Sequence, residues 1–150
     1  MKILVSACLL GIRCRYDGSG HCDPRMEKLM EKHCLIPVCP EIYGGLPTPR
    51  TPAERVGDKV VSKAGEDVTA AFLKGAEETL ALAKLFGLRY ALLKERSPSC
   101  GFGEIYDGTF LGALTQGDGV TSELLAEHGI AVFGESRLGE LLEIFGTCDA

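Results

Sequence analysis

Four short apolar strands, each followed by a helical pattern, constrain the fold of this chain more than any other feature of its sequence. The expected strands cover residues 2–7, 34–38, 88–94 and 130–133. Continuous apolar segments of this length are typical of strands that are buried on both faces of a parallel sheet. Because these strands alternate with helices, we predict an α/β fold with a Rossmann-like, doubly wound and mainly parallel sheet, in the strand order 2-1-3-4.

Apolar residues that recur on one face predict helices at residues 24–33 and 68–86. Two further helices are expected at 121–128, which Gly129 closes, and at 137–145. Pro24 suits the first turn of the first helix, where its missing N–H has no intrahelical partner. Asp67 or Thr69 is expected to cap the second helix and Thr121 the third, because their side chains can accept hydrogen bonds from free N–H groups.

One segment is rich in proline and glycine. Residues 40–52 hold four prolines and two adjacent glycines, a composition that we interpret as excluding a helix or a central strand. We therefore predict a rigid, irregular loop there. No repeat or linker interrupts the sequence, and residues 1–150 are predicted to form one domain.

Two small hairpins are expected as insertions in the main fold. The first covers residues 54–62 and turns at Gly57-Asp58. The second covers residues 104–116 and turns at Asp107-Gly108, so that its second strand would begin at 109–111. Both predictions rest on Gly-Asp or Asp-Gly pairs between short runs of β-forming residues.

The balance of charges and the number of cysteines narrow the possible functions. The net charge of −5 at pH 7 argues against an extended nucleic-acid surface, because such a surface needs a dominant basic patch. We find no export segment and no apolar run of transmembrane length, and we predict a cytoplasmic location without membrane contact. Disulfides rarely persist in a reducing compartment, so metal binding or catalysis is the better interpretation for some of the seven cysteines.

Three cysteines lie at or just beyond the carboxyl ends of predicted core strands. They are Cys8, Cys39 and Cys100, and the predicted strand order makes their strands neighbours. Adjacent strands are about 5 Å apart, so the thiols can meet over the edge where doubly wound sheets bind ligands. We favour a thiophilic metal centre, zinc or iron–sulfur, over buried structural thiols or a redox pair. Three ligands would leave one coordination position open for catalysis.

The other cysteines are weaker candidates. Cys14 shares a loop with Cys8, and a fourth ligand from Cys14 would close the metal site and weaken the catalytic interpretation. Cys22 and Cys148 are expected in exposed polar segments. Cys34 begins a strand, and we interpret it as a core residue because a free cysteine usually behaves as a small buried hydrophobe.

The stretch that carries Cys100 is dense in functional groups. Residues 94–101 read Lys-Glu-Arg-Ser-Pro-Ser-Cys-Gly and directly follow the third predicted strand. Pro98 disfavours the helical region for Ser97, so the segment is expected to run extended before it turns at Gly101. This concentration of charges, hydroxyls and a thiol predicts a functional loop rather than a solvated connector.

Several of these motifs, taken together, resemble the thiouracil desulfidase family. The similar segments are residues 6–11, 15–18, 37–41, 44–50, 67–69, 94–101, 106–108 and 117–121. They include Ser-Ala-Cys-Leu-Leu-Gly around Cys8 and Pro-Val-Cys-Pro-Glu around Cys39. The resemblance keeps the order and spacing of the family and extends over about residues 3–135, nearly the whole chain.

The resemblance implies an enzyme with an oxygen-sensitive [4Fe-4S] cluster that is held by Cys8, Cys39 and Cys100. It also implies that the iron without a protein ligand binds the sulfur of a small thiolated pyrimidine, which is 2- or 4-thiouracil or a thiouridine form. Hydrolytic desulfuration would then release hydrogen sulfide without a change of redox state.

The conversion of C=S to C=O needs an activated water molecule and a source of protons. Glu41, two residues after Cys39, is the predicted general base or acid, and the alternative is a loop carboxylate that is paired with Arg50. Ser97 and Ser99 are predicted to hydrogen-bond the pyrimidine or to relay a proton. Their alternative role is to cap the backbone within the turn.

Charged residues near these motifs are candidates for substrate binding. Asp17, Arg15 and Arg50 are predicted to orient the loops or to hold an anionic ligand, and the alternative is a set of structural or surface ion pairs. Residues 94–96 are expected to brace the functional loop.

Two other functions are compatible with the same residues. One is a non-catalytic sulfur-carrier or nucleotide-binding protein, which would bind sulfur species without turnover. The other is a zinc-dependent hydrolase that uses the same three cysteines. In protein prepared in air the cysteines can hold zinc or no metal in each of these cases, so the metal must be tested without oxygen.

Overall fold

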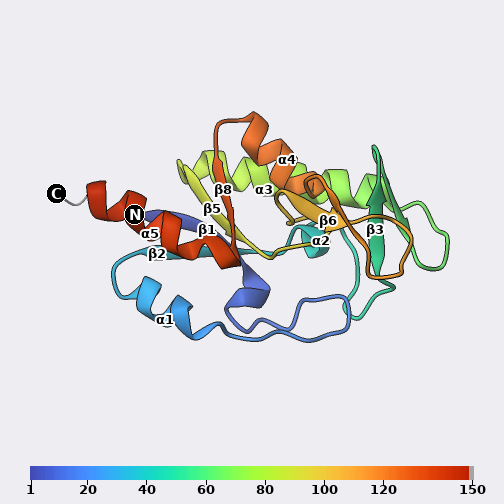
Figure 1. The fold of residues 1–150 in the computed structure, drawn as a ribbon, viewed down its shortest axis with the longest axis horizontal. Helices are drawn as coiled ribbons and strands as arrows, with labels where there is room; N and C mark the ends of the chain where they lie inside the picture. Colours follow the sequence, from blue (N-terminus) through green and yellow to red (C-terminus); the bar gives the residue numbers. More distant parts are fainter. Residues whose placement is uncertain (149–150) are drawn as a thin grey trace.

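The four predicted core strands form one parallel sheet. The computed structural model describes the backbone of residues 1–148 and the side chains of residues 1–145. The strands are β1 (Lys2–Ser6), β2 (Cys34–Val38), β5 (Tyr90–Leu93) and β8 (Ala131–Gly134). They pair in parallel in the order β2-β1-β5-β8, which confirms the predicted fold class and the order 2-1-3-4 of the core strands (Figure 1).

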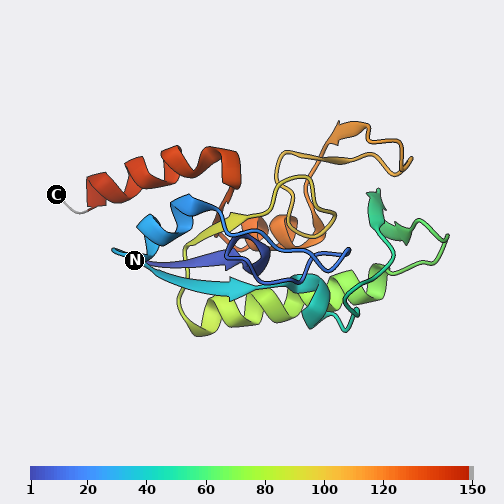
Figure 2. The same ribbon diagram turned by 90° about the horizontal axis from the view of Figure 1, so that it is seen from below.

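Helices cover both faces of this sheet. They are α1 (Pro24–Met30), α3 (Thr69–Leu85), α4 (Val120–Glu127) and α5 (Leu138–Cys148). α3 and α4 pack on one face, and α1 and α5 pack on the other (Figure 2). Within residues 1–148, no helix combines the length and the apolar character that crossing a membrane requires.

The first strand shows how the two faces divide its side chains. Ile3 and Val5 belong to the core beneath α1 and α5, whereas Leu4 belongs to the core beneath α3 and α4. All three side chains are fully buried. Because both faces are covered, successive residues of the strand are apolar, which explains the continuous run in the sequence. Burial of each such side chain contributes roughly 1.5–3 kcal/mol relative to exposure.

Two hairpins extend beyond the carboxyl ends of the core strands, as the green and orange segments in Figure 2 show. β3 (Ala53–Val56) pairs with β4 (Lys59–Ser62), and β6 (Glu104–Tyr106) pairs with β7 (Leu114–Gln116). The first hairpin agrees with the prediction. In the second hairpin, the prediction of a strand at 109–111 is wrong, because Gly108 and Phe110 adopt positive φ angles of 96° and 59°. These angles lie outside the β region, so residues 107–113 form a loop.

Residues 40–52 contain a short helix that the sequence analysis excluded. α2 (Pro40–Tyr43) begins directly after Cys39 and ends at Gly44. A proline is well tolerated at the first helical position, where its missing N–H would have no partner, so Pro40 can start this turn. The prediction of an entirely irregular loop is therefore wrong for the first residues of the segment.

Some helix ends also differ from the predictions. α1 ends earlier than expected. The residue that precedes α3 is Val68, which makes no side-chain cap, although Asp67 Oδ1 accepts a hydrogen bond from the backbone N–H of Thr69 at 2.9 Å. Gly119 rather than Thr121 precedes α4. Thr121 is fully buried within the first turn of that helix, where it cannot serve as the cap.

α2 lies close against α3 because two glycines leave no side chain between them. A Cβ added to Gly75 of α3 would lie 1.9 Å from the carbonyl oxygen of Pro40. A Cβ added to Gly44 would lie 2.0 Å from the carbonyl oxygen of Ala71. Both distances are far shorter than a van der Waals contact. This approach fixes α2 and, with it, the residues 39–41 that follow β2.

Gly75→Ala is expected to lower the free energy of unfolding by roughly 1–3 kcal/mol, because the added methyl group must push α2 away from α3. The matched control is Gly139→Ala in α5, where an added Cβ would meet no atom within 4 Å. This control is expected to raise the free energy of unfolding by roughly 0.5–1 kcal/mol. Denaturant titration, monitored by circular dichroism, gives the free energy of unfolding of both variants and of the parent protein. A free energy for Gly75→Ala equal to that of Gly139→Ala would contradict the close contact of α2 with α3.

Candidate metal centre

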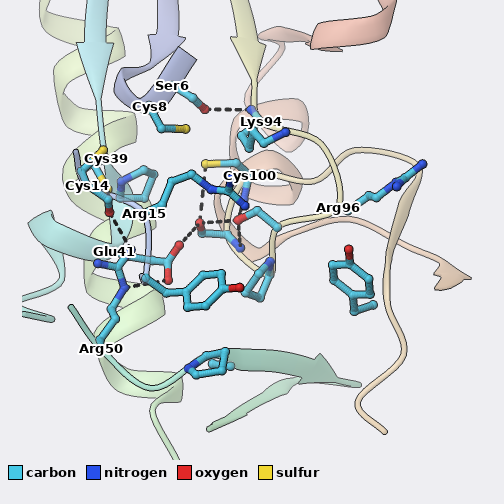
Figure 3. A pocket seen from close by; sticks show the side chains of 18 of the residues that line it. Ser6, Cys8, Cys14, Arg15, Cys39, Glu41, Arg50, Lys94, Arg96 and Cys100 are labelled. Atoms are coloured by element: carbon cyan, nitrogen blue, oxygen red, sulfur yellow. Dashed lines mark hydrogen bonds and ion pairs between the residues drawn. The ribbon is translucent and has the colours of Figure 1, made fainter. Parts of the chain in front are cut away.

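The three cysteines predicted to converge line one cavity at the carboxyl edge of the sheet. Cys8 lies in the 3-10 helix η1 (Ala7–Leu9) after β1, Cys39 precedes α2, and Cys100 lies in the loop after β5. β1 pairs with both β2 and β5, so the three segments leave the sheet side by side. The cavity has a volume of about 450 Å³, and all three residues are part of its lining (Figure 3).

The chemistry of these side chains suits an iron–sulfur cluster. No three cysteine, histidine, aspartate or glutamate side chains among the described residues are close enough together to hold one metal ion. Three cysteines nevertheless line the same cavity. Thiolates are the usual ligands of iron–sulfur clusters, in which each cysteine binds one iron and inorganic sulfide bridges the irons. The donor set therefore fits an iron–sulfur cluster with three cysteine ligands.

Burial favours the protonated form of these thiols. Desolvation raises the pKa of Cys8 to about 11, although the charges of Lys94 and Arg15 act to lower it. Desolvation also raises the pKa of Cys100, which is buried, to about 12. Since a metal binds the thiolate, loading of a metal at neutral pH must release protons from these cysteines.

Cys14 is a fourth thiol at this site. It is buried, packs with Ala7, Cys8 and Cys39, and lines the same cavity. Its carbonyl oxygen accepts a hydrogen bond from Cys39 Sγ at 3.7 Å. Desolvation raises the pKa of Cys14 to about 12. The structure thus places Cys14 beside two of the predicted ligands, as the sequence analysis allowed.

Two further cysteines lie away from this cavity. Neither Cys22 nor Cys34 is part of its lining. Cys34 is exposed at the start of β2, so its interpretation as a core residue is wrong. The reason is that β2 is an edge strand, which has a neighbouring strand on one side only. The side chain of Cys148 lies outside the described residues.

A series of hydrogen bonds leads from the loop after β5 to Glu41. Ser97 Oγ accepts hydrogen bonds from the backbone N–H groups of Ser99 and Cys100, both at 3.1 Å. Because both lone pairs of Ser97 Oγ are used in this way, the Ser97 hydroxyl hydrogen is free to point toward Ser99 Oγ, which is 3.0 Å away. Ser99 Oγ in turn donates to Glu41 Oε2 at 3.1 Å. Ser97 therefore caps the turn, as its alternative role required, whereas Ser99 connects the turn to the carboxylate.

Glu41 is also paired with Arg50, whose guanidinium is largely used by the protein. Arg50 Nε donates to Glu41 Oε1 at 3.2 Å, and Nη2 donates to the carbonyl oxygen of Cys14 at 2.9 Å (Figure 3). Nη1 donates to the Pro47 carbonyl and the Thr48 hydroxyl. The side chain of Arg50 is only 6% exposed. Because these contacts occupy its guanidinium, Arg50 is better suited to orient the loops than to bind a substrate.

The first turn of α4 holds the loop that carries Ser99 and Cys100. The backbone N–H of Thr121 donates to the carbonyl of Ser99 at 2.9 Å, and Ser122 Oγ donates to the carbonyl of Cys100 at 2.6 Å. A Cβ added to Gly119 would lie 2.4 Å from the carbonyl carbon of Ser99, so this approach requires glycine. Neither Gly119 nor Ser122 had a predicted role, and the only signal was that Gly119 lies in the segment 117–121, which resembles the desulfidase family.

The other predicted substrate residues occupy different positions. Arg15 lines the cavity together with Cys8 (Figure 3). Asp17 does not line it, because its side chain is exposed and its Oδ1 accepts hydrogen bonds from the N–H and the hydroxyl of Ser19. The bonds from Ser19 hold the pKa of Asp17 below its usual range. Asp17 therefore shapes its own loop, and Arg15 is the better candidate for contact with a ligand.

Of the three charged residues at 94–96, two connect the functional loop to other elements and one is exposed. The backbone N–H of Lys94 donates to Ser6 Oγ at 2.9 Å and ties the end of β5 to the end of β1. Glu95 Oε1 accepts a hydrogen bond from the backbone N–H of Ser136 at 2.6 Å. Both contacts agree with the predicted bracing role. Arg96 is exposed, has a φ of 67° and lines the cavity.

Aromatic side chains without a predicted role complete the cavity. Tyr16, Tyr106 and Phe110 are part of its lining. Tyr16 and Tyr106 lie within segments that resemble the desulfidase family, which was the only signal for them in the sequence. Phe110 belongs to the loop that was predicted as a strand. Flat apolar side chains of this kind are typical of sites that bind planar rings.

The fold and the site together define a class of protein. A doubly wound sheet presents buried thiols, a carboxylate and hydroxyls at its switch point, which is the arrangement of an α/β enzyme with a soft-metal centre. A family model described as 2-thiouracil desulfurase matches residues 3–137, and the chain belongs to this family. The predicted family, and with it an enzyme of the thiouracil desulfidase type, is thereby confirmed.

Two relatives are similar over nearly their whole length. A solved structure described as "[4Fe-4S]-dependent thiouracil desulfidase TudS" is 50% identical, with a TM-score of 0.92 and coverage of 97% of this chain and 98% of that chain. "Uncharacterized protein YbbK" of Bacillus subtilis (strain 168) is 45% identical over 150 residues, which cover 93% of this chain and 99% of the relative.

Proposed function

We propose that this chain catalyses the hydrolytic desulfuration of a thiolated pyrimidine, 2- or 4-thiouracil or a thiouridine form, with release of hydrogen sulfide. The observation that carries the proposal is that three cysteines and the hydrogen-bonded pair of Glu41 and Ser99 line one cavity. Membership in the desulfurase family supports it. The cofactor is a [4Fe-4S] cluster, as in the similar thiouracil desulfidase of known structure.

Cys8, Cys39 and Cys100 are the proposed ligands of the cluster. They come from three neighbouring loops and line the same cavity, and Cys14 packs beside them without being part of the proposed set. A cluster held by these three cysteines would have one iron without a protein ligand, and this iron would supply Lewis-acid chemistry toward the sulfur of the substrate.

Glu41 is the proposed general base and acid. Arg50 donates to Oε1 and thereby orients the carboxylate, while Oε2 is hydrogen-bonded to the Ser99 hydroxyl, with which it can exchange a proton. In the reaction, the oxygen of a water molecule replaces sulfur on the ring carbon, and C=S becomes C=O. One proton of the water passes to Glu41, and both protons finally leave with the sulfur as hydrogen sulfide, so no electron is gained or lost.

The remaining side chains bind and orient the substrate. Ser99 is proposed to pass the proton between Glu41 and the substrate, while Ser97 holds the Ser99 hydroxyl in place. The aromatic side chains of the cavity contact the flat ring and exclude water from it. Arg15, which lines the cavity, is proposed to bind polar groups of the substrate.

Anaerobic reconstitution with iron and sulfide, followed by a sulfide-release assay, tests the proposal. The substrates are 2-thiouracil, 4-thiouracil and their nucleosides. The expected result is brown protein that releases many equivalents of sulfide per chain from at least one of them, with the oxygen analogue as the other product. A sulfur carrier would release no more than one equivalent, and a zinc hydrolase would turn over without iron. Either result, or iron-loaded protein that releases no sulfide, would overturn the proposal.

A further inference from the structure

The loop of residues 107–113, between β6 and β7, forms part of the cavity wall. Phe110 and Gly112 of this loop line the cavity, as does Tyr106 at the end of β6. The tip of the loop has little packing of its own, because Leu111 is 83% exposed. β6 lies in contact with β3 of the other hairpin, so β3 is placed to support the loop.

One buried carboxylate of β3 fixes this loop. Glu54 is 9% exposed, and its Oε1 accepts hydrogen bonds from the backbone N–H groups of Gly108 at 2.9 Å and Phe110 at 3.1 Å. No cation forms an ion pair with Glu54 within the described part of the chain. The two backbone donors are therefore what stabilises its charge, and hydrogen bonds to an ionised acceptor are among the stronger ones in proteins.

The backbone of the loop needs this support. Phe110 has a φ of 59°, a conformation that residues other than glycine rarely adopt. Gly108 has a φ of 96°, and a Cβ at this position would lie 2.3 Å from Val56 Cγ2 of β3. Both residues donate their N–H groups to Glu54. The carboxylate thus holds a conformation that the local sequence does not favour.

We propose that Glu54 is a positioning residue for substrate binding. By fixing residues 107–113 it keeps Phe110 in the cavity wall, where a flat ring can lie against it. This inference rests on the proposed function, since it takes a thiolated pyrimidine as the occupant of the cavity. Glu54 lines the cavity, but its Oε1 is used by the loop, so it acts through Phe110 rather than on the reacting atoms.

Hydrogen exchange at the two donor amides tests the contact without turnover. In Glu54→Ala the amides of Gly108 and Phe110 are expected to exchange about tenfold faster or more, because each loses a hydrogen bond to a charged acceptor. In Glu54→Gln, whose side-chain oxygen can still accept both bonds, exchange should stay close to that of the parent protein. Leu111→Ala is the matched control at the loop tip and should leave both amides unchanged. Unchanged exchange in Glu54→Ala would overturn the inference.

Steady-state kinetics of the reconstituted enzyme test the role in binding. Glu54→Ala is expected to raise KM about tenfold with kcat nearly unchanged, and Glu54→Gln is expected to restore KM. Phe110→Ala should raise KM by a similar factor, whereas its Gly108 amide should exchange at the parent rate. This second variant keeps the test decisive if Glu54→Ala does not fold. A loss of kcat in Glu54→Gln, or faster exchange in Glu54→Ala without a change in KM, would overturn the inference. Parent enzyme that releases no sulfide would instead contradict the proposed function, because the exchange result does not depend on turnover.

Discussion

Replacement of Cys100 by alanine is expected to abolish iron binding and sulfide release together. Cys100 is buried in the lining of the cavity that it shares with Cys8 and Cys39, and two thiols alone do not complete the proposed set of ligands. Because the reaction then loses its metal centre, turnover should fall by at least about 10³-fold, to the background rate. Iron and acid-labile sulfide are measured after anaerobic reconstitution, on the same sample as sulfide release.

Two further cysteine variants make this result specific. Cys34→Ala changes an exposed thiol at the start of β2 and should retain both iron and activity. Cys14→Ala should also retain iron, although the loss of a buried side chain will lower its stability. Loss of iron in Cys14→Ala would make Cys14 a fourth ligand and close the position proposed for the substrate. If Cys100→Ala binds as much iron as the parent protein, Cys100 is not a ligand of the cluster.

Glu41→Gln is expected to retain the cluster and lose most of the catalytic rate. Its kcat should fall by roughly 10²–10⁴-fold, the usual contribution of general acid–base catalysis. Glutamine keeps the shape of the side chain, and its one oxygen can still accept the bond from Arg50. Its NH₂ group then lies beside Ser99 Oγ, whose hydroxyl can turn to accept a hydrogen bond in place of donating one, so the geometry of the loop should persist. Iron content, the absorption spectrum and steady-state kinetics together separate an effect on chemistry from an effect on the metal centre.

The control for charge is Glu31→Gln, which removes an exposed carboxylate at the end of α1 and should leave kcat unchanged. Iron-loaded Glu41→Gln with the kcat of the parent enzyme would exclude Glu41 from proton transfer. Loss of iron in Glu41→Gln would instead mean that the carboxylate supports the metal centre, and the assignment of a general base would have to be abandoned.

The sheet and the position of the site could be predicted because their signals are local. Each core strand is a short apolar run, and the alternation of strands with helices leaves few topologies for a parallel sheet. Cys8, Cys39 and Cys100 stood out because each follows such a strand, and the carboxyl ends of these strands are where doubly wound sheets bind ligands. No spacing motif joins the three cysteines, so the strand order was needed to bring them together.

Features that depend on contacts between distant segments could not be predicted. Residues 107–113 follow their hydrogen bonds to Glu54 rather than their own β-propensity, and the predicted strand is lost as a result. Gly119 and Ser122 hold the loop of Cys100 from a helix that begins after it. Glycine, serine and glutamate are ordinary surface residues in the sequence, and only the approach of another segment gives them these roles.

The cavity is built from two kinds of structure that can change independently. The proposed ligands and Glu41 belong to segments at the sheet edge, where packing against α3 and α4 leaves little room for variation. Glu54, Tyr106 and Phe110 belong to the two hairpins beyond the sheet, which contribute none of the proposed ligands. Insertions and substitutions are better tolerated in such projecting segments than in the core. Descendants of one ancestral enzyme can therefore acquire new thione substrates by remodelling these hairpins, while they inherit the metal chemistry unchanged.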